Sequence, residues 1–117
     1  MALPLPQLLK IMVDEGGTDL HLTTNSPPII RVHGKLRRID HPNLSPAETK
    51  QIIYSILNDS QKHVFEEDWE LDFSFGVKNV ARFRANVFMQ RGAVAGAFRR
   101  IPYEIYSFEK LGLPPTV

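Results

Sequence analysis

The most informative stretch is ARFRANVFMQRGAVAGAFRRI, residues 81–101, which reads as two long strands joined by a tight turn. Apolar side chains fill every second position of 81–90, as in a strand with one buried face. Arg91-Gly92 suits a two-residue hairpin turn, and residues 93–101 form a second apolar run. The stretch therefore predicts an antiparallel hairpin that supplies two strands of a sheet.

The arginines of this hairpin are its main functional candidates. Alternation puts Arg82 and Arg84 on the face away from the core, and a two-residue turn places Arg99 directly opposite Arg84. Like charges opposite each other destabilise a sheet, so removal of either arginine should not lower stability, and an external anion would find a site there. Alternatively, Glu70 or Asp72 on a neighbouring strand pairs with these arginines, and the face is simply solvated.

Working outward, the same rules predict the other elements. Apolar residues at helical spacing precede Gly16-Gly17, Ser45-Pro46 begins a second helix with a capping box, and a shorter helix follows. The elements then form an α+β domain with helices packed on an antiparallel sheet. The first helix ends before Gly16, the second begins at Ser45 and the third covers 61–67. The other predicted strands cover 18–22, 30–32, 36–39 and 69–75, with a Gly34-Lys35 turn before the third of them.

Composition narrows the class of protein. The chain has 117 residues, 43% of them hydrophobic, which fits one domain with an ordinary core. It has no cysteine and a net charge of +1, which argues against disulfides and against a global field for nucleic acid or anionic membranes. The opening lacks the pattern of a signal peptide, and no apolar run is long enough to span a bilayer. We expect a soluble cytoplasmic domain.

The other polar patterns are weaker candidates for a functional site. Asp19 and His21 share a strand face, but no third catalytic group accompanies them, so we expect Asp19 to bond nearby backbone and both residues to be structural. The histidines lack metal-ligand spacing, and no metal site is expected. The acidic run 66–68 is a solvated helix end or a contact for a basic partner. ARFRANVF lacks the glycine pattern of RNA-binding strands, and no P-loop is present.

Four segments in order resemble the N-terminal part of PilT-type secretion ATPases. They are GGTDLHL (16–22), PPIIRVHGKLRRID (27–40), YSILNDSQKHVFEEDWELDFSFGV (54–77) and ARFRANVFMQRGAVAGAFRRIPYEIYSFEKLGLPPTV (81–117). The family more often has serine at the position of Thr18. The resemblance covers nearly the whole chain, but the nucleotide-binding core of the family is missing.

The resemblance implies a PAS-like domain over 1–101 and a linker over 102–117 toward a RecA-like ATPase domain, with a short helical turn near 108–111. Such ATPases form cytoplasmic hexamers at the inner-membrane base of type IV pili, next to pilus base proteins. They use ATP and Mg²⁺ to retract the pilus and power twitching motility. The N-terminal domain packs on the ATPase domain of an adjacent identical subunit and points arginines toward its nucleotide. Carried over residue by residue, these arginines are Arg84 and Arg99, followed by Arg82 and Arg100.

The resemblance also limits what this chain does alone. Without a P-loop it should hydrolyse no ATP, hold no cofactor and remain mainly monomeric. Related pilus assembly and type II secretion ATPases usually carry another domain ahead of this one, so a helix near the start of the chain favours the retraction type. The alternatives are an N-terminal domain of those related ATPases, or a free PAS-like module that binds a ligand or another protein.

Overall fold

The computed structural model describes residues 3–101, which form three helices and six strands. The 102–117 linker and the helical turn expected near 108–111 lie outside the described residues, and the domain boundary stays a prediction. The elements are α1 (Leu5–Asp14), β1 (Gly17–Leu22), β2 (Ile29–Val32), β3 (Lys35–Arg38), α2 (Pro46–Tyr54), α3 (Asp59–Asp68), β4 (Glu70–Val77), β5 (Ala81–Gln90) and β6 (Ala93–Ile101).

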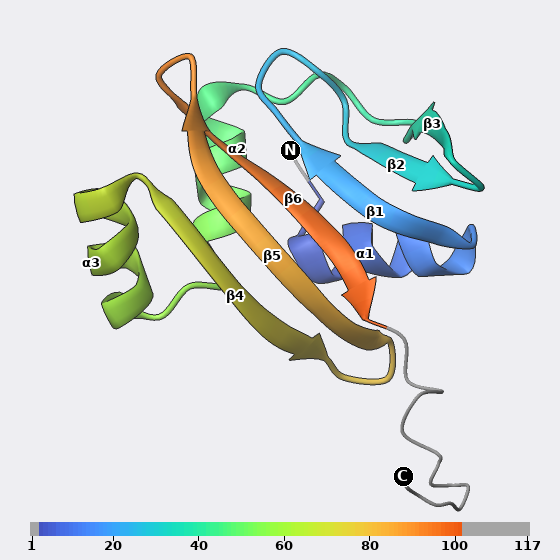
Figure 1. The fold of residues 1–117 in the computed structure, drawn as a ribbon. Helices are drawn as coiled ribbons and strands as arrows, with labels where there is room; N and C mark the ends of the chain where they lie inside the picture. Colours follow the sequence, from blue (N-terminus) through green and yellow to red (C-terminus); the bar gives the residue numbers. More distant parts are fainter. Residues whose placement is uncertain (1–2, 102–117) are drawn as a thin grey trace, which may run out of the picture.

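The strands form one antiparallel sheet in the order β3-β2-β1-β6-β5-β4. The first and last strands of the described chain, β1 and β6, therefore lie side by side in its middle (Figure 1). Helices α1 and α2 lie behind the sheet in that view, and α3 lies beside β4. The predicted α+β class is confirmed. The opposite face of the described sheet, which we call the outer face, carries no helix.

The helix starts follow capping chemistry. The Ser45 hydroxyl accepts a bond from the backbone N–H of Glu48, and the Glu48 carboxylate accepts one from the backbone N–H of Ser45. The third helix begins two residues earlier than predicted. Asn58 and Gln61 form a second capping box, so Asn58 starts the helix instead of interrupting the chain.

The hairpin turns set the register of the sheet. Arg91 and Gly92 both have positive φ, 53° and 78°, which matches the twist of a two-residue hairpin and places Arg84 opposite Arg99 as predicted. The turn between β2 and β3 is His33-Gly34, one residue earlier than predicted.

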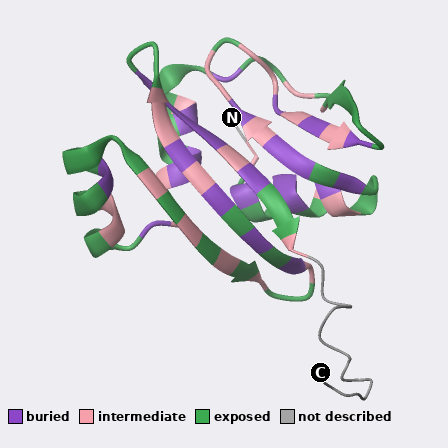
Figure 2. Cartoon of the chain, in the orientation of Figure 1, coloured by how far each residue is buried: buried purple, intermediate pink, exposed green. Residues whose placement is uncertain are grey.

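The core lies between the sheet and the helices. Figure 2 shows the alternation of burial along β5, where the buried set includes Phe83 and Val87. Phe98 from β6 is fully buried beside them, and the α1 residues predicted from helical spacing complete the layer. Those residues are Leu5, Leu8, Leu9 and Met12.

Gly17 is required by close packing where β1 begins. A Cβ there would lie 2.9 Å from Met12 Cγ and 3.1 Å from the Arg31 carbonyl oxygen. Because a backbone carbonyl cannot move aside without distorting the sheet, we expect Gly17→Ala to lower the free energy of unfolding by about 1–3 kcal/mol, measured by urea denaturation. Gly76→Ala is the control, because its nearest neighbour is a flexible Arg82 guanidinium nitrogen at 3.3 Å. Equal losses for both variants would contradict this packing argument.

Candidate functional site

A row of five charged residues, which we call the ladder, crosses the outer face of the sheet. It runs from Asp72 on β4 through Arg84 on β5, Arg99 on β6 and Asp19 on β1 to Arg31 on β2. Arg84, Arg99, Asp19 and Arg31 are direct cross-strand neighbours, and Asp72 reaches Arg84 diagonally. Strand pairing thus brings together charges that lie far apart in the sequence.

Asp19 is the buried member of the ladder. Its side chain is 11% exposed, and Arg99 Nε donates to its Oδ1 at 2.9 Å. Thr18 Oγ1 donates to Oδ2 at 2.8 Å, and Arg31 Nε lies 3.7 Å from the same oxygen. Burial by itself raises the pKa of Asp19, but the hydrogen bonds from Arg99 and Thr18 and the charge of Arg99 outweigh it, so the pKa is held below its ordinary value. Asp19 is therefore a charged anchor.

The other end of the ladder is exposed. Arg84 donates to Asp72 from Nη2 at 3.1 Å and from Nε at 3.4 Å, and this hydrogen bonding raises the pKa of Arg84 above its ordinary value. The two carboxylates thus lie on the outer sides of the arginine pair, one on β4 and one on β1. Nothing negative among the described residues is paired with both Arg84 and Arg99. The gap between the two guanidinium groups is the natural place for an external anion.

The pair borders a shallow hollow of about 340 Å³ in the outer face. Its lining includes both arginines and both carboxylates of the ladder, together with His21 and Asn86. His21 is half-buried, and its side chain makes no hydrogen bond to the other described residues. The hollow is open to solvent and bordered by charged side chains, so it suits a charged group presented by another molecule better than an enclosed ligand.

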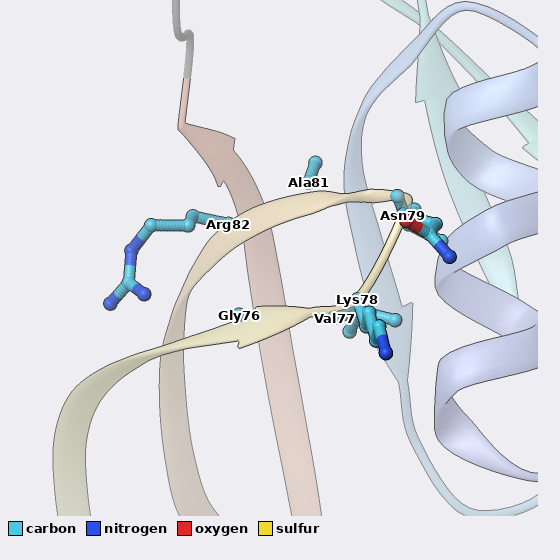
Figure 3. Close-up of a pocket in the computed structure, with 7 residues that line it drawn as sticks. Gly76, Val77, Lys78, Asn79, Ala81 and Arg82 are labelled. Carbon is cyan, nitrogen blue, oxygen red and sulfur yellow. The ribbon is translucent and has the colours of Figure 1, made fainter.

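The remaining two candidate arginines lie elsewhere. Arg82 is on the outer face one step along β5 and lines a second hollow, of about 450 Å³, at the β4–β5 turn. Figure 3 shows its side chain pointing away from Lys78 and Asn79, so the Arg82 and Lys78 cations do not converge there. Arg100 pairs with Phe83 and therefore lies on the helix-side face. The structure brings together Arg84 and Arg99, keeps Arg82 nearby and separates Arg100 from them.

Sequence reasoning missed two partners in this site. Arg31 alternates with buried Ile30 and Val32, which indicates the outer face, but only the strand order places it beside Asp19. The expectation that Asp19 bonds nearby backbone was wrong in its partner, because the Arg99 and Thr18 side chains donate the hydrogen bonds to its carboxylate. The alternative that a carboxylate on a neighbouring strand pairs with the arginines is right for Arg84, which forms an ion pair with Asp72.

Two absences hold for residues 3–101, the part of the chain that the structure describes. No group of three or more histidine, aspartate or glutamate side chains gathers closely enough there to hold a metal ion. Within the same residues, no helix is long and apolar enough to cross a membrane.

The Asp19 anchor makes stability depend on pH. Because its folded pKa lies below the ordinary value of 3.8, its stabilisation is present above that pH and is lost as the pH falls through the folded value. We expect Asp19→Asn to lower the free energy of unfolding by about 1–3 kcal/mol at neutral pH. The gap between variant and parent should then narrow in acid, in urea melts across a pH series. Asp72→Asn, at the exposed end, is the control and should show little of either effect.

The two arginines should also differ in stability. The expectation that neither substitution lowers stability no longer fits Arg99, because Arg99→Ala leaves the buried Asp19 carboxylate with the Thr18 hydroxyl and, as its one remaining cation, the more distant Arg31. We expect Arg99→Ala to lower the melting temperature clearly and Arg84→Ala to change it little, because the Arg84 ion pair is solvated. Equal melting temperatures for the two variants would show that the Asp19–Arg99 pair contributes nothing to stability.

Comparison with known proteins places this fold in context. No protein-family model matches the chain. The chain is 44% identical to the type IV pilus retraction ATPase PilT of Pseudomonas aeruginosa over 109 residues, covering 93% of this chain and 32% of that protein. It is 35% identical to the type IV pilus ATPase PilU of the same organism, covering 92% and 28%. The chain thus spans about a third of the length of these relatives.

A solved structure agrees with the sequence comparison. The crystal structure of the pilus retraction motor PilT with bound ADP superposes on this chain with a TM-score of 0.83 at 44% identity, covering 97% of this chain and 33% of that one. The described α+β sheet is therefore the fold of the matching PilT region. By sequence and by fold together, the chain belongs to the PilT family as an N-terminal domain of a PilT-type ATPase.

Proposed function

We propose that the chain is the N-terminal domain of a hexameric type IV pilus retraction ATPase that drives twitching motility. In this proposal it packs on the RecA-like ATPase domain of an adjacent identical subunit and offers Arg84 and Arg99 to the nucleotide bound there. One observation carries the proposal: the two arginines face each other across β5 and β6, with their carboxylate partners only on the outer sides.

The geometry suits a phosphate. The side chains of Arg84 and Arg99 are 69% and 73% exposed, so a ligand can reach both. Each guanidinium has five N–H donors, and Arg99 uses only Nε in its bond to Asp19. Free donors remain to form a fork on phosphate oxygens, and a phosphate between two guanidinium groups removes their mutual repulsion. Arg82 would add charge at the border of this site, whereas Arg100 lies on the other face.

The nucleotide itself would be held mainly by another domain. The chain has no P-loop sequence, and its described residues gather no acidic group for Mg²⁺. The residues that are present fit one part of the task, contact with the phosphates of a neighbour's ATP. When bound, ATP with Mg²⁺ supplies the phosphoryl chemistry, and the arginines of this chain position and neutralise the phosphate charge.

Three alternatives fit less well. The greater identity to the retraction ATPase PilT than to the type IV pilus ATPase PilU favours a retraction motor over a PilU-type ATPase. Domains of pilus assembly and type II secretion ATPases remain the nearest alternative. A free ligand-binding module needs an enclosed apolar cavity, and the hollows of the described residues are open to solvent. A cytoplasmic place at the inner-membrane base of the pilus, beside pilus base proteins, follows from the proposed activity.

The proposal predicts a split between folding and activity. In a protein that joins this domain to its ATPase domain, Arg84→Ala should leave the fold intact and reduce ATP hydrolysis, by up to roughly 10³–10⁵ if the arginine touches the transition state. Arg99→Lys should also reduce hydrolysis. The double variant Arg84→Ala with Arg99→Lys should hydrolyse ATP little more slowly than either single variant, as for groups acting as a unit. Phosphate release from purified rings measures this, with Lys10→Ala on α1 as the matched control.

Three results would contradict the proposal. The first is hydrolysis at the normal rate in rings of Arg84→Ala that melt like the parent. The second is normal surface spreading and normal pilus number in cells that carry Arg84→Ala in place of the parent gene, since a retraction motor without activity leaves pili extended. ATP turnover by the 117-residue chain alone would also contradict it.

A further inference from the structure

Strand β3 is an exposed, basic edge of the sheet, separated from the arginine pair by β2 and β1. All four of its residues are exposed, and it appears exposed along its length in Figure 2. Leu36 is 59% exposed, more than the other exposed large hydrophobic residues of the described chain. Three of the four residues are basic: Lys35, Arg37 and Arg38.

The backbone of β3 has groups free to pair with another strand. Val32 and Lys35 flank a two-residue turn, so they form a hydrogen-bonded pair, and Arg37 with Ile30 forms the next one. The bond from the Ile39 N–H to the Pro28 carbonyl, at 2.8 Å, continues the same alternation. The N–H and C=O groups of the residues between them, Leu36 and Arg38, therefore point away from β2. An edge with this arrangement can accept an added strand.

A hollow beside this edge can receive side chains of the added strand. It has a volume of about 370 Å³ and lies between β3, α1 and the segment that follows β3. Its apolar lining comes from Leu3, Ile11, Ile30 and Ile39, and its charged rim from Glu15, Arg37, Arg38 and Asp40. In strand addition, main-chain bonds give affinity, and pockets for alternate side chains give specificity. An apolar residue at every second position would reach this hollow.

Charge decides which strand fits. Arg37 is paired with Glu15 at 2.9 Å, whereas Lys35 and Arg38 have no ion pair with the described residues. A second copy of β3 would bring like charges together across the new pair, which disfavours self-pairing. We propose that the β3 edge binds an extended acidic segment of another protein, in which apolar residues alternate with carboxylates.

The probe is a short fluorescein-labelled peptide in which glutamate and valine alternate, titrated with the chain and followed by fluorescence anisotropy. We expect saturable binding that weakens by about tenfold in Arg38→Glu, because a charge-assisted contact is lost and repulsion is added. Lys78→Glu, at the β4–β5 turn, is the matched control and should bind like the parent. A peptide of alternating lysine and valine should not bind.

A second pair of probes tests the backbone contact. Leu36→Pro removes an outward N–H without removing a bond to β2, and proline is tolerated at such edge positions, so binding should weaken by about tenfold in a chain that still folds. If that variant does not fold, the same peptide with its alternate amides N-methylated replaces it and should not bind the parent chain. Equal binding of the methylated peptide would overturn the proposal.

A membrane is the competing partner for a basic edge. Flotation with phosphatidylserine vesicles tests it in the same buffer. Binding to vesicles without binding to the peptide would overturn the proposal, as would a dimer in sedimentation that Leu36→Pro abolishes. Because β3 lies apart from Arg84 and Arg99, these results are independent of the ATP hydrolysis experiments.

Discussion

The ion pair between Asp19 and Arg99 ties together two strands that are 80 residues apart in the sequence. It lies on β1 and β6, the central strands, so the other strands of the outer face extend to either side of this contact. A carboxylate as buried as Asp19 requires hydrogen-bonded positive charge, and only the native β1–β6 register supplies Arg99. The pair therefore favours one register of the sheet as well as stabilising it.

The same sheet keeps its packing face and its charged face separate. Alternation sends Phe83 and Phe98 toward the helices and Arg84 and Arg99 toward the outside. Substitutions on the outer face can consequently change charge without opening a cavity in the core. This separation is what allows the arginine pair to be tuned for an anion while the fold is kept.

Sequence reasoning predicted what alternation and turn chemistry determine. The hairpin at Arg91-Gly92, the register of Arg84 with Arg99 and the helix cap at Ser45 follow from local rules, and the structure has all three. The neighbours of β1 and β2 do not follow from local rules, because strand order depends on packing of the whole chain. Arg31 beside Asp19 appears only once that order is known, whereas the place of Arg100 on the face opposite Arg99 follows from alternation along the strand.

The charge ladder explains how an arginine pair can persist without its ligand. Arg31, Arg84 and Arg99 carry three positive charges against two negative charges on Asp19 and Asp72, which leaves one positive charge in excess. The carboxylates offset most of the repulsion when no anion is present, so the domain does not depend on nucleotide to fold. In the proposed function, the excess charge and the unused guanidinium donors would attract a phosphate. Because the carboxylates lie on the outer sides of the arginine pair, that phosphate would displace neither carboxylate.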